Sequence, residues 1–184
     1  MKNILLLITA LLLVHIATAQ IPTISTNKLG ALKLGETTPD SLSALLDQKL
    51  VLPKYVPTPD NNYRTDTVNA VYKSLAIRLS LTRYYEVNGK GQLIGKVHCT
   101  IGSIYSADKN IRTKSGIAPG DDKFDIIKKL DGSYLRVSPD YNFQPVNKQY
   151  TVVCLSDTDS GNELTLYFRD NKLYAMSCEE SIGE

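Results

Sequence analysis

The stretch Ser115–Leu130 reads S-G-I-A-P-G-D-D-K-F-D-I-I-K-K-L. It predicts a tight glycine-containing turn that leads into one short amphipathic helix. Asp122 and Asp125 place negative charge at the start of this helix, where the helix dipole favours it. The expected apolar stripe consists of Phe124, Ile127 and Leu130, and Gly132 favours a stop just beyond it.

A similar pattern occurs earlier in the chain. Ala31–Asp47 reads A-L-K-L-G-E-T-T-P-D-S-L-S-A-L-L-D, and a shift of 85 residues (120 − 35 = 85) aligns Gly35 with Gly120. Thr38 fits the N-cap of a helix and Pro39 its first position. The expected stripe here consists of Leu42, Leu45 and Leu46. A pattern that recurs at this spacing predicts two copies of one small unit.

The first residues resemble a secretory signal peptide. Lys2 supplies the positive start, Leu5–Ile16 is a largely apolar run, and Ala17-Thr18-Ala19 fits a cleavage site of small residues. The run is shorter than the roughly 20 apolar residues that a membrane span needs. We expect cleavage after Ala19, which leaves 165 residues (184 − 19 = 165) in the periplasm or outside the cell.

Composition and charge narrow the classes of partner. The chain has 21 basic and 19 acidic residues and contains no long basic run, which argues against a nucleic-acid partner. It has 11 Tyr against 3 Phe and no Trp, and tyrosine is typical of strands and interfaces.

The three cysteines, Cys99, Cys154 and Cys178, permit at most one internal disulfide, and three pairings are possible. None of the cysteines has the C-x-x-C spacing of a redox or zinc site. Buried free thiols are the favoured interpretation.

Alternating apolar and polar residues from Leu75 onward predict a half-buried strand, and Asn88-Gly89-Lys90-Gly91 predicts a turn into the next strand. If Val87 pairs with Leu93, the core-side pairs are Leu81–Cys99 and Leu79–Ile101. Arg83 then falls on the apolar face, so we expect a bulge near it. The residues expected to face outward are Thr82, Tyr84, Lys96 and His98.

The last hairpin has the clearest signal: a strand over Glu163–Phe168, a turn at Asp170-Asn171 and a strand over Leu173–Cys178. The expected pairs are Phe168–Leu173 and Leu166–Ala175 on one face, and Tyr167–Tyr174 and Thr165–Met176 on the other. The order of elements is therefore helix, strands, helix, strands. It predicts an α+β fold with short helices packed on one face of antiparallel sheet. The units are residues 20–105 and 106–184 after the signal peptide 1–19, or one continuous domain.

The phrase I-A-P-G-D-D-x-x-D-I-I-K-K-L and the final L-Y-F-R-D-N-K-L-Y-A-M resemble the repeat unit of SmpA/OmlA outer-membrane lipoproteins and of beta-lactamase inhibitory protein. Thr113–Asp121 is also similar to a motif of uncharacterised exported proteins of gram-negative, bacteroidete-type bacteria. The resemblance implies a protein-binding module. It covers most of Thr113–Cys178 and only the helix start of the first half. The lipid-bearing cysteine of the outer-membrane members is missing, so an anchor does not carry over.

Few residues suggest catalysis. After cleavage His98 is the one histidine, and Cys99 next to it on the same strand points to the opposite face, which prevents a nucleophile–base hydrogen bond. The sequence contains no G-x-S-x-G, P-loop or dinucleotide-binding pattern. We expect no enzymatic activity and no cofactor.

Asp157, Asp159 and Glu163 flank Gly161 in a loop whose oxygens would suit calcium. The third ligand that a calcium loop normally carries before its glycine is missing, and a polar connection between strands explains the same composition. The metal site is therefore the lesser interpretation of this loop.

Tyr167, Tyr174 and Met176, together with Tyr84, are the expected outward-facing partner site. Amphipathic aromatic residues on an uncovered sheet face are typical protein-binding anchors, although a cross-strand tyrosine pair also stabilises its own hairpin. The leading hypothesis is a non-enzymatic, exported module that binds another envelope or extracellular protein. The alternative is a small-ligand or glycan binder, with or without a calcium dependence through Asp157 and Asp159.

Overall fold

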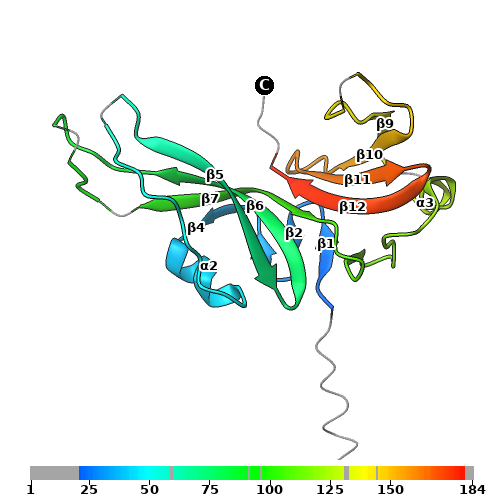
Figure 1. Cartoon of the computed structure of the whole chain (residues 1–184), viewed down its shortest axis with the longest axis horizontal. Helices are drawn as coiled ribbons and strands as arrows, with labels where there is room; N and C mark the ends of the chain where they lie inside the picture. The colour runs from blue at the N-terminus through cyan, green and yellow to red at the C-terminus, as the bar shows by residue number, and fades with distance from the viewer. Residues whose placement is uncertain are drawn as a thin grey trace, which may run out of the picture.

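The computed structural model describes residues 21–58, 60–90, 92–95, 97–130, 133–143 and 145–180 (Figure 1). The predicted signal peptide and its cleavage site lie outside these residues, as do Lys96 and Gly132.

The fold is mainly β, and the predicted α+β class with helix-then-sheet units is wrong. In the described ranges the helices are α2 (Pro39–Leu45) and α3 (Lys123–Lys129), each seven residues long. Strands occupy much of the remaining chain: β1 Thr23–Ser25, β2 Lys28–Leu29, β3 Leu32–Lys33, β4 Gly35–Thr37, β5 Tyr63–Tyr72, β6 Leu75–Tyr84, β7 His98–Ser106, β8 Arg112–Thr113, β9 Leu135–Pro139, β10 Tyr150–Ser156, β11 Glu163–Arg169 and β12 Lys172–Glu179. The error arises because strands also form where none is predicted, in residues 23–37 and 63–72, whereas each helix ends after two turns.

The large sheet is continuous across both halves of the chain. Its order is β5-β6-β7-β12-β11-β10-β9, and β4 also pairs with β7. One side of β7 pairs with β6, and its other side pairs first with β4 and then with β12. The boundary expected between residues 105 and 106 therefore falls inside β7. The two halves are arranged alike: β5, β6 and β7 form one meander, and β10, β11 and β12 form another. The last strands of the two meanders, β7 and β12, pair with each other.

A smaller sheet, in the order β3-β2-β1-β8, lies with α2 against one face of the large sheet (Figure 1). The buried apolar side chains form one cluster that draws on both halves, from Ile24 and Leu42 through Leu79 and Ile104 to Leu166 and Cys178. We call the opposite side of the large sheet the outer face.

The two glycines aligned in the sequence have nearly the same backbone conformation, with φ of +98° at Gly35 and +97° at Gly120. Gly35 pairs with Ile101 in β7, and the Gly120 amide donates to the Leu173 carbonyl of β12 at 2.8 Å. A φ in this range favours glycine over residues that carry a Cβ atom. The repeated sequence pattern therefore marks a repeated local conformation.

The helices that follow start at different distances from these glycines. The N-cap Thr38 lies three residues after Gly35, whereas the N-cap Asp122 lies two residues after Gly120. This one-residue difference rotates α3, so that Ile126 is buried and Phe124 is 58% exposed. Phe124 was therefore wrongly predicted to belong to the buried apolar stripe of α3. In α2, Leu42 and Leu46 are buried as expected, but Leu45 is 40% exposed.

The first predicted hairpin is correct at its turn and wrong in its strands. Val87 pairs with Leu93 as expected. Further from the turn, the observed pairs are Arg83–Cys99, Leu81–Ile101 and Leu79–Ile104. The register shifts between Ser80 and Leu81, where Gly102 is the extra residue on β7, so the bulge lies there and not near Arg83.

Arg83 remains on the core face because a carboxylate neutralises it. Asp66 on β5 accepts from Arg83 Nη2 at 2.5 Å and from Arg64 Nε at 2.7 Å, and Arg83 Nη2 also donates to the Pro53 carbonyl at 2.9 Å. The Asp66 and Arg83 side chains are 5% and 8% exposed. Burial opposes ionisation of Asp66, but the hydrogen bonds and charges of the two arginines outweigh it and lower the pKa of the carboxyl.

Candidate functional site

A chain of five aromatic rings crosses the outer face in the C-terminal half. The rings belong to β7, β11, β12, β10 and the loop before β10, and we call them the aromatic row: Tyr105, Tyr167, Tyr174, Tyr150 and Phe143. Successive ring centroids lie 5.7, 6.2, 6.4 and 3.8 Å apart. The guanidinium of Arg78 on β6 lies over the Tyr105 ring at 4.4 Å and extends the row by one side chain.

Tyr167 is held in place within the row by polar contacts. Tyr167 shares a hydrogen bond with Ser177 at 3.1 Å and donates to Glu179 at 3.4 Å. Burial raises the pKa of Tyr167 to about 12, and burial together with the charge of Asp140 raises the pKa of Tyr174 to about 12. Both phenols are therefore protonated at neutral pH.

The predicted partner residues are distributed differently from expectation. Tyr167 and Tyr174 lie on the outer face, half-buried, and are neighbours in the row. They do not pair directly, because a register shift at Tyr174 sets Tyr167 opposite Ala175 and Leu166 opposite Met176. The same shift turns Met176 into the core, where it is 0% exposed, so its expected outward position is wrong. The Phe168–Leu173 pair is confirmed.

Tyr84 faces outward as expected and is 47% exposed. Its ring lies 6.4 Å from that of Tyr63, near the turn end of the first hairpin. The structure therefore does not bring Tyr84 together with Tyr167 and Tyr174, and the Tyr63–Tyr84 pair forms a separate aromatic site.

Sequence reasoning missed a set of exposed apolar side chains in and around the edge strand β9. They belong to the turn before β9, to β9 and to the segment after it, and they are Tyr134 (82% exposed), Val137 (53%), Tyr141 (64%), Phe143 (36%) and Val146 (43%). Phe143 stacks on Tyr150, and the Asp140 amide donates to the Tyr150 carbonyl, so this segment is fixed against β10. One feature of the sequence could have revealed them. Residues 134–146 contain five large apolar residues among polar ones, and their spacing fits neither a strand nor a helix.

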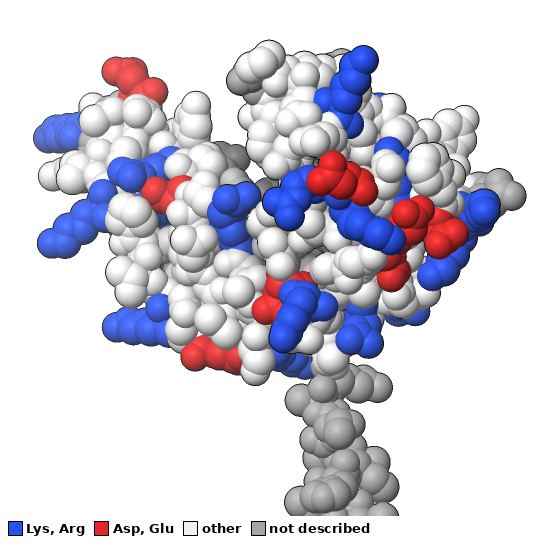
Figure 2. Space-filling model, turned by 45° about the vertical axis from the view of Figure 1, so that its right-hand side comes forward, with Lys and Arg blue, Asp and Glu red and all other residues white. Residues whose placement is uncertain are grey.

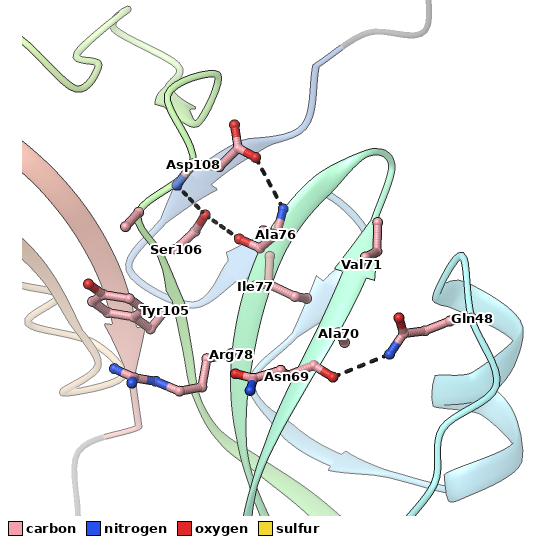
Figure 3. Close-up of a pocket in the computed structure, with 11 residues that line it drawn as sticks. Gln48, Asn69, Ala70, Val71, Ala76, Ile77, Arg78, Tyr105, Ser106 and Asp108 are labelled. Atoms are coloured by element: carbon pink, nitrogen blue, oxygen red, sulfur yellow. Dashed lines mark hydrogen bonds between the residues drawn. The ribbon is translucent and has the colours of Figure 1, made fainter.

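Two hollows lie beside Arg78 and Tyr105. The larger, which we call the hairpin cavity, has a volume of about 500 Å³ and lies beside the β5–β6 hairpin (Figure 3). Figure 3 shows Arg78 and Tyr105 together at one side of it, with Gln48 reaching toward Asn69. The smaller, the serine hollow, has a volume of about 130 Å³ and is lined by Thr67, Arg78, Ser80, Ser103, Tyr105, Tyr167, Ser177 and Glu179.

Basic and acidic side chains are interspersed over the face shown in Figure 2. That face carries no continuous basic stripe of the kind that a nucleic-acid backbone attracts.

In the predicted calcium loop, Asp157 and Glu163 each accept hydrogen bonds from groups of the protein. The Asp157 carboxylate accepts from the Asp159 amide at 3.0 Å, and Glu163 accepts from Ser156 at 2.8 Å and from Arg136 at 3.0 Å. The contacts of Asp157 and Glu163 are therefore separate from each other. No group of three or more His, Cys, Asp or Glu residues suited to a metal occurs in the part of the chain that the structure describes.

The cysteines are all buried and free, in agreement with the favoured interpretation. Burial raises the pKa of the Cys99 thiol and raises that of Cys178 to about 12, so both remain protonated at neutral pH. His98 is exposed and lies 3.6 Å from Glu86, on the opposite face of β7 from Cys99. The expected separation of His98 and Cys99 is confirmed.

Comparison of the chain with family models, with curated proteins and with solved structures finds no match. The resemblance to the SmpA/OmlA and beta-lactamase inhibitory protein units therefore remains a prediction. Among residues 21–180, apart from the few positions left undescribed, no helix has both the length and the hydropathy needed to cross a bilayer.

Proposed function

We propose that this chain is an exported, non-enzymatic module of the cell envelope or the extracellular space that binds another protein. The observation that carries the proposal is the aromatic row, which crosses the outer face and ends in exposed apolar side chains on the segment around Phe143. Aromatic and arginine side chains dominate the binding energy of protein interfaces, and exposed apolar groups beside them are typical of docking surfaces.

The construction of the row supports rigid presentation of this surface. Tyr167 is hydrogen-bonded to Ser177 and Glu179, and Tyr150 lies between the Phe143 and Tyr174 rings. Side chains that are already fixed lose little conformational freedom on binding, which favours affinity. The buried thiols of Cys99 and Cys178, whose pKa values are raised, and the exposed His98 support a role other than nucleophilic catalysis.

The loop from residue 141 to 149 also indicates the character of the partner. It contains Lys148 and no acidic residue, while Tyr141, Phe143 and Val146 expose apolar surface. We therefore expect the partner to present an apolar patch with a neutral or acidic rim.

The test is capture of partners from a native envelope extract with three baits. These are the wild-type protein, the double variant Tyr141→Ala/Phe143→Ala, and the matched control Tyr63→Ala/Tyr84→Ala, which removes an exposed aromatic pair elsewhere. We expect the wild type to capture a discrete partner. The amount captured by the first variant is expected to fall at least tenfold, and the control is expected to capture as much as the wild type. A partner retained equally by both variants contradicts the proposal.

A further inference from the structure

The serine hollow exists because short side chains meet in the middle of the outer face. Ser80 on β6 lies opposite Ser103 on β7, and Thr67 and Glu179 flank this pair on the next strands. The neighbouring positions carry the long side chains of Arg78, Tyr105 and Tyr167. Small residues surrounded by large ones leave a depression with a polar floor and partly aromatic walls.

The hydrogen-bonding groups of this depression are largely uncommitted. Within the described residues, the side-chain hydroxyls of Thr67, Ser80 and Ser103 have no hydrogen-bond partner, and the Arg78 guanidinium has no hydrogen bond or ion pair beside its contact with Tyr105. Glu179 accepts from Ser177 and Tyr167 through Oε1 alone, which leaves Oε2 free. Donors, an acceptor and hydroxyls that act as either therefore line one small space.

The charges of the lining are balanced. A simple anion is attracted by Arg78 but repelled by Glu179. A simple cation is attracted by Glu179 but repelled by Arg78. A neutral polyhydroxylated molecule uses both groups, because its hydroxyls donate to the carboxylate and accept from the guanidinium. The ring carbons of a sugar also find apolar contact on the tyrosine rings.

The hairpin cavity continues this site. Arg78 and Tyr105 line both hollows, so the hairpin cavity and the serine hollow are adjacent. Its volume of about 500 Å³ lies in the range of small-ligand sites, and it combines the apolar Val71 and Ala76 with the amide of Asn69. An oligosaccharide thus has room for one residue in the serine hollow and its neighbour in the cavity.

We propose that the outer face binds a neutral oligosaccharide, with one sugar residue in the serine hollow and Arg78 and Tyr105 between it and the next residue. This activity does not depend on the protein-binding surface around Phe143, which lies at the other end of the aromatic row. Arg78 and Glu179 hydrogen-bond the sugar hydroxyls, and Ser80 and Ser103 form the floor.

The experiment is saturation-transfer NMR of the purified protein with two neutral probes, cellotetraose and triacetylchitotriose, and with two charged competitors, the cationic trimer of glucosamine and the anionic trigalacturonate. We expect at least one neutral probe to bind and neither charged competitor to displace it. Ser103→Val fills the hollow and Arg78→Gln removes its cation, and each is expected to weaken binding at least tenfold.

Thr100→Val is the matched control, since it makes a similar change on β7 outside both hollows. It is expected to bind like the wild type. The proposal is overturned if neither neutral probe binds, if a charged competitor displaces the bound sugar, or if Ser103→Val and Arg78→Gln bind like Thr100→Val. Circular dichroism of each variant establishes that it is folded.

Discussion

At the residue scale, the buried ion pair of Asp66 and Arg83 could not be predicted from the sequence pattern. The alternation of β6 places Arg83 among apolar residues, but its partner is on another strand 17 positions earlier. Nothing in the local sequence joins the two charges, so a bulge was the natural expectation. The pair keeps β6 regular and attaches the segment at Pro53 to the sheet through the second hydrogen bond of Arg83.

We predict that Asp66→Asn lowers the free energy of unfolding by about 3 kcal/mol, because it leaves the guanidinium of Arg83 buried without a counter-charge. Urea unfolding followed by circular dichroism measures the loss. The double variant Asp66→Leu/Arg83→Met removes both charges and is expected to recover most of it. A loss of less than about 1 kcal/mol in the single variant would show that the pair is not desolvated in solution.

The same carboxylate predicts a pH dependence. The pKa of Asp66 is lower in the folded state than its ordinary value of about 3.9, so its contribution is fully present above that value and is lost as the pH falls through the folded pKa. The difference in unfolding free energy between the wild type and Asp66→Asn is therefore expected to be constant from about pH 7 to 5 and to shrink below about pH 4. A difference that instead grows as the pH falls from about 7 to 4 would mean that the pKa is raised in the folded state.

At the element scale, turns with standard residues were predictable and bulges were not. Asp170 and Asn171 adopt φ of 52° and 63°, as their residue types favour in a tight hairpin. Lys73 and Ser74 take similar values in the β5–β6 turn without such a signal, which is why β5 was not recognised. The shifts at Tyr174 and Gly102 change which side chains share a face, and a bulge leaves no pattern in the alternation. The face of the sheet predicted for Met176 was wrong for this reason.

We predict that Gly35→Ala and Gly120→Ala each destabilise the protein by about 1–2 kcal/mol, because an L-residue is strained at a φ near +97° even where space is open. Thermal unfolding by calorimetry measures both. Gly89→Ala is the control, since that glycine also has open space around it and no positive φ. Equal stability of all three variants would contradict the account of the two glycine turns.

At the scale of the whole molecule, one sheet and one core join the two halves. β7 pairs with β12, and the buried cluster runs from Ile24 to Cys178. The sequence suggested two related segments because their turns repeat, but how they join depends on pairing between strands more than 60 residues apart. The candidate site shares this property, since Arg78, Tyr105 and Tyr167 come from different parts of the chain.

We therefore predict a single cooperative unfolding transition. Far-ultraviolet circular dichroism reports the strands, and tyrosine fluorescence reports the surroundings of the 11 tyrosines, because the chain contains no tryptophan. The two urea curves are expected to have the same midpoint, as in other two-state domains. Two separated midpoints would show that the halves unfold independently.

The most direct test of the proposed binding surface is site-specific photo-crosslinking in the native envelope. A photoreactive phenylalanine analogue replaces Phe143 in one sample and Tyr84 in the other, since both side chains are exposed aromatic groups at separate places on the molecule. The account predicts a discrete crosslinked protein from position 143 and none of that size from position 84. The same product from both positions, or a product from position 84 alone, would contradict it.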